Sequence, residues 1–334
     1  MKALVTGGAG FIGSNLVNAL VERGDDVRVL DNFSTGSRAN LEGLDVEVVE
    51  GELRSYERVH AAVRGIEVVY HLGALGSVPR SVQDPLTSNA VNVEGTLNVL
   101  LAARDEGVRR VIFSSSTSVY GTARELPTPE STPLDPISPY GVTKLAAERY
   151  CISFARVYDS FETVVLRYFN VFGPRQSPYS QYAAAVPLFI AAIDQGERVT
   201  IYGDGEQSRD FTYVGNVVDA TMRAADASGV SGRTFNVAAG SPASVNHVAE
   251  TIGVILGKPV ERQFEPPRAA EMSAQESRMS PARELLGYEP RIDLAAGLET
   301  HGRGDRCPSL ISGSTSFASS PGSTWVGPRS TSHT

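Results

Sequence analysis

The chain has 334 residues, of which 41% are hydrophobic and 20% charged, a composition typical of a globular enzyme and too apolar for a disordered chain. Its formal net charge of −8 and the lack of a dense Lys/Arg cluster argue against a nucleic-acid or membrane partner. No apolar run reaches membrane-span length, so we expect a cytoplasmic protein without a signal peptide. The cysteines, Cys151 and Cys307, are far apart and predict free thiols and no metal site.

The first predicted elements form a βαβ unit. Residues 2–6 and 26–30 are apolar strands, and residues 14–23 between them have helical periodicity. The turn Gly8-x-Gly10-x-x-Gly13 lets backbone amides and the helix N-terminus meet a pyrophosphate. Asp31 ends the second strand, where a carboxylate accepts from ribose hydroxyls and repels a 2′-phosphate. The pattern predicts NAD rather than NADP. A glycine turn alone would also fit a loop that only connects a strand to a helix and binds no ligand.

The following segments predict an α/β fold, a Rossmann-type doubly wound parallel sheet with a smaller α/β substrate-binding lobe. Further strands are expected at 46–49, 68–70, 110–113 and 163–166, with helical stretches between them. After residue 167 the chain becomes richer in Pro, Gly and Tyr, which indicates the lobe. A helix at 217–227 and a strand at 233–237 are expected to return to the first domain.

From these elements we expect the chain to consist of two domains and a C-terminal tail. A NAD-binding domain comprises residues 1–169 with 210–237, and the substrate-binding lobe comprises 170–209 with 238–300. From residue 301 the chain is rich in Ser and Gly and lacks a packing face, so residues 301–334 are predicted to be a poorly ordered tail.

A candidate catalytic group follows strand 110–113. The run Ser114-Ser115-Ser116 lies at the carboxyl end of a parallel strand, where open α/β sheets place their ligands. Tyr140 and Lys144 are one helical turn apart, so an ammonium can favour an ionised phenol. Each pattern alone also fits a structural role, as a polar turn or as a half-buried Tyr beside a surface Lys.

Taken together in this order, the glycine turn, Asp31, the serine run and Tyr-x-x-x-Lys resemble the extended short-chain dehydrogenase/reductase family over about residues 1–300. Longer stretches at 71–81, 166–176 and 202–210 resemble nucleotide-sugar 4-epimerases. The resemblance implies that Tyr140 takes the proton of the sugar 4-hydroxyl while C4 gives its hydride to NAD. Lys144 would lower the phenol pKa and hold the nicotinamide ribose, and Ser116 would bond the same sugar oxygen. The 4-keto sugar would then turn over and receive the hydride on its other face.

The same resemblance implies contacts to both ligands, with Glu52 standing where the family has Asp. For NAD, beside Tyr140 and Lys144, they are Gly7, Gly10, Phe11, Ile12, Asp31, Asn32, Ser34, Thr35, Glu52, Leu53, Leu72, Ala74, Asn92 and Tyr168. For a UDP-sugar they are Ser77, Ser116, Thr117, Ser118, Asn170, Arg175, Val186, Tyr202, Arg209, Arg268 and Gln275. The family also implies a homodimer formed through a helix pair.

Residues 117 and 118 discriminate between related reactions. The related dehydratases carry Asp-Glu at Thr117 and Ser118, and the decarboxylases carry Glu at Ser118, so their absence favours epimerisation. Gln275 stands where epimerases that accept N-acetyl sugars have a small residue, so it should crowd that group. Thr117 and Ser118 with Arg175 nearby suit a 6-carboxylate. We therefore favour UDP-glucuronate, with UDP-N-acetylglucosamine and UDP-glucose as alternatives. A nucleotide-sugar dehydrogenase or dehydratase and a non-catalytic dinucleotide-binding protein are the rival classes.

Overall fold

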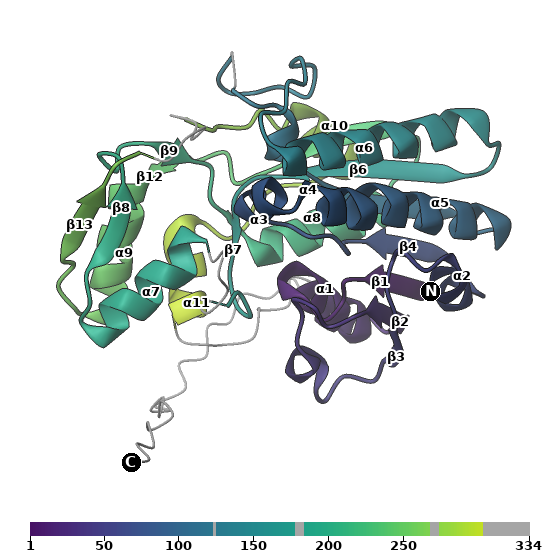
Figure 1. The fold of residues 1–334 in the computed structure, drawn as a ribbon, viewed down its shortest axis with the longest axis horizontal. Helices are drawn as coiled ribbons and strands as arrows, with labels where there is room; N and C mark the ends of the chain where they lie inside the picture. Colours follow the sequence, from purple (N-terminus) through teal and green to yellow (C-terminus); the bar gives the residue numbers. More distant parts are fainter. Residues whose placement is uncertain (123–124, 178–183, 268–273, 303–334) are drawn as a thin grey trace.

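A seven-stranded parallel sheet forms the larger part of the protein (Figure 1). The computed structural model describes residues 1–122, 125–177, 184–267 and 274–302. Along the sheet the strand order is β11-β6-β5-β4-β1-β2-β3. The strands are β1 (Lys2–Thr6), β2 (Asp26–Asp31), β3 (Glu47–Glu50), β4 (Val68–His71), β5 (Arg110–Ser116), β6 (Glu162–Tyr168) and β11 (Arg233–Val237). The order reverses between β1 and β4, the switch point at which such sheets bind ligands. The predicted doubly wound sheet is confirmed.

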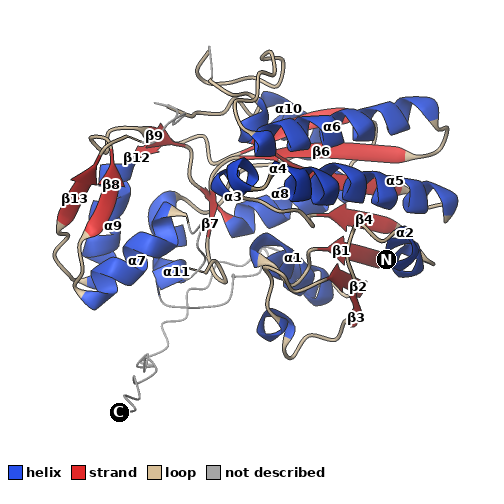
Figure 2. Cartoon of the chain, in the orientation of Figure 1, coloured by secondary structure: helices blue, strands red, loops and turns tan. Residues whose placement is uncertain are grey.

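Helices cover both faces of this sheet (Figure 2). One apolar cluster joins the sheet to α1 (Phe11–Glu22) and α8 (Val214–Asp226). A second joins it to α2 (Tyr56–Val63), α5 (Gly95–Asp105) and α6 (Pro139–Val157). Alternate residues of one strand enter different clusters, as with Ala3 and Leu4, because successive side chains of a strand point to opposite faces. Burial on both faces explains the nearly continuous apolar runs of these strands.

Short helical elements connect β4 to α5 and lead from β5 toward α6. They are α3 (Val78–Gln83), α4 (Pro85–Asn89), the π-helix η2 (Ala90–Glu94) and the 3₁₀-helix η3 (Thr117–Val119), and another 3₁₀-helix, η1 (Arg38–Leu41), follows β2. The first three and η3 all pack against α6. The surroundings of α6 therefore come from several separate segments.

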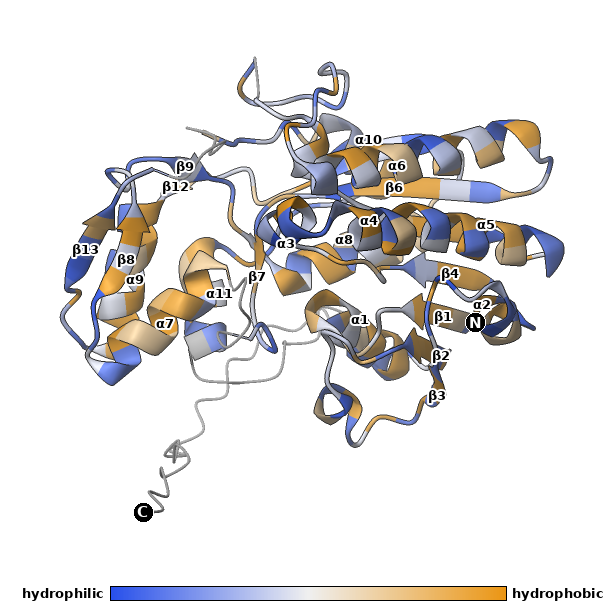
Figure 3. Ribbon diagram, viewed as in Figure 1, coloured by the Kyte–Doolittle hydropathy of each residue, from blue (hydrophilic) through white to orange (hydrophobic). Residues whose placement is uncertain are grey.

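The remaining elements form a smaller lobe with short two-stranded pairings. Its strands pair as β7 (Val171–Phe172) with β10 (Thr212–Tyr213), β8 (Val199–Tyr202) with β13 (Arg262–Glu265), and β9 (Ser208–Arg209) with β12 (Ala243–Ser244). Its helices are α7 (Ala185–Gln195), α9 (Val245–Leu256) and α11 (Leu294–Gly302), whereas α10 (Ser280–Leu286) packs against β11 and α8 of the main sheet (Figure 1). The apolar helices α7 and α9 pack together (Figure 3).

Several predicted element boundaries shift. The strand predicted at 110–113 continues to Ser116, because β6 pairs with the backbone of all three serines. The strand at 233–237 does return to the main sheet, parallel to β6. His301 and Gly302, the first residues of the predicted tail, belong to α11. The rest of that tail, with Cys307, lies outside the described residues. Within those described, no helix combines the length and apolar composition that crossing a membrane requires.

Candidate active site

The glycine turn between β1 and α1 forms a cradle of backbone atoms. Gly7 has a φ of 69°, and a Cβ there would lie 2.8 Å from the Cα of Gly73. At Gly13 a Cβ would lie 2.1 Å from the carbonyl oxygen of Gly7. The cap residue of α1, Gly10, provides no side-chain hydrogen bond, and the first turn holds no acidic residue. These backbone amides and the positive helix end therefore suit a diphosphate.

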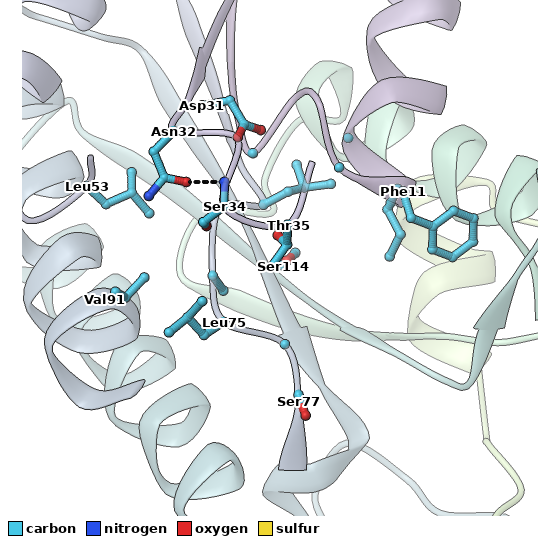
Figure 4. Close-up of a pocket in the computed structure, with 18 of the residues that line it drawn as sticks. Phe11, Asp31, Asn32, Ser34, Thr35, Leu53, Leu75, Ser77, Val91 and Ser114 are labelled. Carbon is cyan, nitrogen blue, oxygen red and sulfur yellow. Dashed lines mark hydrogen bonds between the residues drawn. The ribbon is translucent and has the colours of Figure 1, made fainter. Parts of the chain in front are cut away.

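A pocket of about 640 Å³ opens over this turn at the switch point of the sheet (Figure 4). In the close-up, Asp31 and Asn32 come from the end of β2, and Phe11 lies at the start of α1. The predicted cofactor contacts that line it are Gly7, Gly10, Phe11, Ile12, Asp31, Asn32, Ser34, Thr35, Glu52, Leu53, Leu72 and Ala74. The size and the residues fit a dinucleotide bound across the crevice.

Asp31 is held at the pocket by two backbone amides. One carboxylate oxygen accepts from the N–H of Ala9 at 2.9 Å, and the other accepts from Phe33 at 2.8 Å. Each oxygen keeps a further lone pair, so the carboxylate can still accept from ribose hydroxyls. Glu52 forms an ion pair of 2.5 Å with Arg54 at the pocket wall. That arginine was missed, because only its place next to a predicted contact could have indicated it.

Four predicted cofactor residues lie outside the pocket lining: Tyr140 and Lys144 on α6, and Asn92 and Tyr168. Asn92 is buried, and its amide bonds both the N–H and the carbonyl of Leu75 and the hydroxyl of Thr143. The hydroxyl of Tyr168 pairs with Thr221 on α8 at 2.8 Å. Both polar groups are committed to protein partners because buried polar groups require hydrogen bonds. Asn92 therefore supports the pocket through Leu75, which does line it.

The start of α6 brings Tyr140 next to the end of β5. Ser138 caps the helix by accepting from the N–H of Gly141 at 3.1 Å, and Pro139 follows in the first turn. The hydroxyl of Ser81 on α3 accepts from the N–H of Tyr140 itself at 3.0 Å. Two otherwise unpaired amides of the helix end are thus satisfied, which fixes the backbone that carries the phenol. Ser81 was not predicted as a site residue.

Lys144 is almost completely buried, at 4% exposure. Its ammonium donates to the carbonyl oxygen of Ser114 at 2.8 Å and lies 4.9 Å from the centre of the Phe113 ring. Burial lowers the pKa of Lys144 from 10.5 to about 8. Hydrogen bonding to Ser114 and the nearby ring offset part of the cost of burying the charge.

The predicted lowering of the Tyr140 pKa is not found. Burial raises the pKa of Tyr140, and hydrogen bonding with Ser116 opposes that rise. The ammonium of Lys144 is instead directed at the backbone of Ser114. Ser116 is thus the residue that favours the ionised phenol in this structure.

Hydroxyl groups surround the phenol at the end of β5. Ser116 donates to the hydroxyl of Ser118 at 3.2 Å and accepts from the N–H of Ser118 at the same distance. Thr117 is buried, and its carbonyl accepts from Tyr120 at 3.0 Å. Residues 116–118 provide three hydroxyl groups at this end of β5.

The substrate-side residues come from the smaller lobe. Asn170 donates to the side-chain oxygen of Gln275 at 2.8 Å, and the N–H of Gln275 donates to the carbonyl of Ser208 at 3.1 Å. The other predicted contacts are spread over Val186 on α7, Tyr202 on β8 and Arg209 on β9, and Arg268 lies outside the described residues. Asn170 and Gln275 are the pair that the structure brings into direct contact.

Arg175 is bonded to the first helix. It adopts a φ of 69°, and its guanidinium donates to the carbonyl of Ser14 on α1 at 2.7 Å. The neighbouring carbonyl of Pro174 accepts from Asn15 at 3.0 Å. Arg175 lines the cofactor pocket, as does Ser77.

The sheet, the cradle and the Ser-Tyr-Lys group together define a dinucleotide-dependent hydride-transfer enzyme of the short-chain dehydrogenase/reductase class. Residues 3–238 match the NAD dependent epimerase/dehydratase family. A UDP-glucose 4-epimerase of Mycolicibacterium smegmatis is 39% identical over 89% of this chain and 96% of its own length.

Solved structures agree. The UDP-glucose 4-epimerase of Thermotoga maritima with UDP-glucose is 37% identical, with a TM-score of 0.87 over 91% of this chain and 98% of the other. The UDP-N-acetylglucosamine 4-epimerase of Methanobrevibacter ruminantium, in complex with UDP-N-acetylmuramic acid, is 36% identical, with a TM-score of 0.86 over 91% and 97%. The chain belongs to the NAD-dependent epimerase/dehydratase family, among the nucleotide-sugar 4-epimerases of the extended short-chain dehydrogenases, and its cofactor is NAD.

Proposed function

We propose that this protein is a UDP-sugar 4-epimerase that interconverts UDP-glucose and UDP-galactose. One observation carries the reaction type: Ser116, Tyr140 and Lys144 meet at the end of β5, and residues 117 and 118 beside them bear hydroxyl groups only. Removing water or carbon dioxide from the sugar needs further acid or base groups, whereas epimerisation needs the trio alone. The 4-epimerase names of the relatives support the same choice.

NAD held by the glycine turn and Asp31 would supply the hydride acceptor for sugar C4 and the hydride donor for its opposite face. Tyr140 accepts the proton of the 4-hydroxyl and later gives it back. Ser116 favours the ionised form of the phenol, and we assign its hydroxyl a hydrogen bond to the same sugar oxygen. Lys144 adds a positive charge next to the strand end, and the surrounding burial excludes water from the exchange.

The choice of UDP-glucose follows from two contacts. The prediction of UDP-glucuronate depended on Arg175 joining Thr117 and Ser118, and its guanidinium instead bonds Ser14 beside the cofactor pocket. Gln275 is a long side chain that accepts a hydrogen bond from Asn170, and we expect it to crowd a 2-acetamido group. A 2-hydroxyl and a neutral C6 suit these surroundings best.

The substrate is tested by offering UDP-glucose, UDP-glucuronate and UDP-N-acetylglucosamine separately and following the 4-epimer by NMR. We expect kcat/KM to be highest for UDP-glucose. A higher value for either other sugar would reassign the substrate while leaving the reaction type intact. Steady release of NADH with any of the three would instead support a dehydrogenase, and binding of NAD without turnover would support a non-catalytic role.

We also propose that the protein forms a homodimer through the α6 side of the sheet. Val82 on α3, Leu86 beside it on α4 and Val142 on α6 expose 63%, 83% and 52% of their surfaces, and these helices pack together. Neighbouring exposed apolar side chains of this kind mark interaction surfaces. Sedimentation should give a dimer for the wild type and a monomer for Val142→Glu, and a monomeric wild type would contradict the proposal. The cytoplasmic location stays a prediction.

A further inference from the structure

A buried ion pair behind the catalytic group has no part in the reaction described above. Glu148 on α6 and Arg167 on β6 are 0% and 3% exposed. The carboxylate accepts from the guanidinium at two nitrogens, Nη2 and Nε, the second at 3.1 Å. Helix α6 runs alongside β6 (Figure 1). Replacing such a pair by apolar residues is often neutral or stabilising, so stability alone is a weak reason for it.

The pair contacts the strand that carries Ser116. The hydroxyl of Ser115 donates to Oε2 of Glu148 at 3.1 Å. Ser115 stands between Ser114, whose carbonyl accepts from Lys144, and Ser116, whose hydroxyl lowers the pKa of Tyr140. Lys144 and Glu148 lie on successive turns of one helix face, and each bonds one of two consecutive serines. Helix and strand are therefore joined at two adjacent points.

Arg167 extends these contacts toward the smaller lobe. Its Nη1 donates to the hydroxyl of Tyr120 at 2.8 Å, and that hydroxyl donates to Asn236 at 2.6 Å. The amide of Asn236 donates in turn to the carbonyls of Thr128 at 3.0 Å and Arg278 at 3.3 Å. The ion pair is thus fixed from both sides and cannot shift without breaking several buried hydrogen bonds.

We propose that Glu148 and Arg167 are positioning residues that hold the serine run against α6, so that the hydroxyl of Ser116 stays beside the phenol of Tyr140. The proposal rests on the epimerase function above and names the residues that keep its catalytic group in register. Neither residue lines the cofactor pocket. Their effect passes through Ser115 to the Ser116 hydroxyl.

Kinetics of Glu148→Gln test the proposal. Gln keeps the shape but removes the charge that orients Ser115 and Arg167. We expect kcat for UDP-glucose to fall about 10- to 100-fold, because small displacements of catalytic groups have effects of this size. KM should change less than about threefold, and bound NAD should be retained. The acidic limb of the kcat profile should move to higher pH, since a weaker bond from Ser116 raises the pKa of Tyr140.

A matched control lies at the other end of the same two strands. Arg110 on β5 and Glu162 on β6 form an ion pair of 2.7 Å, far from the serine run, with Arg110 3% exposed. Glu162→Gln should lower the thermal midpoint and leave kcat and its pH profile unchanged. Equal loss of kcat in both variants would show a general effect of weakening the strands and would overturn the proposal.

A milder variant and a readout without substrate complete the test. Ser115→Ala leaves the ion pair intact and cuts its link to the strand, so it should lower kcat in the same direction even where Glu148→Gln fails to fold. Tyrosinate absorbance at alkaline pH, with Tyr140→Phe subtracted, reports the phenol pKa of the NAD-bound protein directly. If the pKa of the Tyr140 phenol were the same in Ser115→Ala, Glu148→Gln and the wild type, the positioning role would be overturned. A wild type inactive on every UDP-sugar would instead refute the proposed function, because the phenol titration needs no turnover.

Discussion

The cofactor side and the substrate side of this protein are built in different ways. On the cofactor side, backbone amides and glycine turns form the site, and a contact such as Ala9 with Asp31 spans 22 residues of chain. On the substrate side, side chains from separate segments meet, and the contact of Asn170 with Gln275 spans 105 residues. A short motif therefore specifies the first site and leaves the second to tertiary packing. Variants that affect one side should leave the other intact.

Tyr140→Phe should separate the two sides most strongly. We expect kcat to fall about 100- to 10,000-fold, the usual contribution of a general acid or base, because phenylalanine cannot exchange a proton. Bound NAD should survive, since Tyr140 does not line the cofactor pocket. Tyr150→Phe, at an exposed position of the same helix, is the control for removing a hydroxyl. Near-normal turnover of Tyr140→Phe would show that Tyr140 is not the catalytic base.

Gly7→Ala should have the opposite effect. The new Cβ would press on the backbone of Gly73 at 2.8 Å, in a φ of 69°, so the cradle must distort. We expect the affinity for NAD, measured by calorimetry, to fall roughly 10- to 100-fold, as a strain of about 1–3 kcal/mol implies. Gly24→Ala is a matched control, because Gly24 has a φ of 87° and a Cβ there would have no atom within 4 Å. Equal affinities in the two variants would contradict the role given to the cradle.

Lys144 lies between the two sides and should make stability depend on pH. Burial lowers its pKa in the folded protein from 10.5 to about 8, so between these values the unfolded chain binds more protons. Its cost to stability is complete below pH 8 and is lost as pH rises to 10.5. Without NAD, Lys144→Met should be more stable by about 2 kcal/mol at pH 7, after allowing for its lost hydrogen bond.

That advantage should shrink between pH 8 and pH 10.5 when denaturant unfolding is followed across this range. Lys258→Met, at an exposed position, should show no such trend. A difference between Lys144→Met and wild type that does not vary with pH would mean that the ammonium is well compensated by Ser114 and Phe113.

The smallest effect is expected at the wall of the substrate side. Gln275→Ser removes the side chain that Asn170 fixes, so a 2-acetamido group gains space. We expect kcat/KM for UDP-N-acetylglucosamine to rise about 10-fold relative to UDP-glucose, the scale of a change in pocket size. Gln263→Ser, on β13 and exposed, serves as the control. If the ratio of kcat/KM values for the two sugars did not change, another residue would determine which substituent at C2 is accepted.

The sequence predicted best what depends on local pattern. Apolar periodicity identified the strands of the main sheet, and glycine spacing identified the cradle, because both follow from nearby residues. The sequence also predicted the catalytic group at the end of β5. It did not predict that the Lys144 ammonium donates to the carbonyl of Ser114, because that contact depends on tertiary packing.

Long-range contacts are what the sequence could not predict. The left-handed backbone at Arg175 turns its guanidinium to Ser14, which no spacing indicates. The polar groups of Asn92 and Tyr168, which stay predicted cofactor contacts, bond Leu75, Thr143 and Thr221. In each case the partner lies in a different segment, so the sequence near the residue does not reveal it.

The position of β11 bears on how the protein is synthesised. Strand β6 carries Arg167 and lies between β5 and β11, but residues 233–237 follow it only after much of the smaller lobe. Until they emerge from the ribosome, β6 is an open edge whose unpaired backbone groups invite association with other chains. The catalytic end of the sheet can therefore be completed only late in translation, and a chain interrupted before residue 233 would be prone to aggregate rather than to bind sugar.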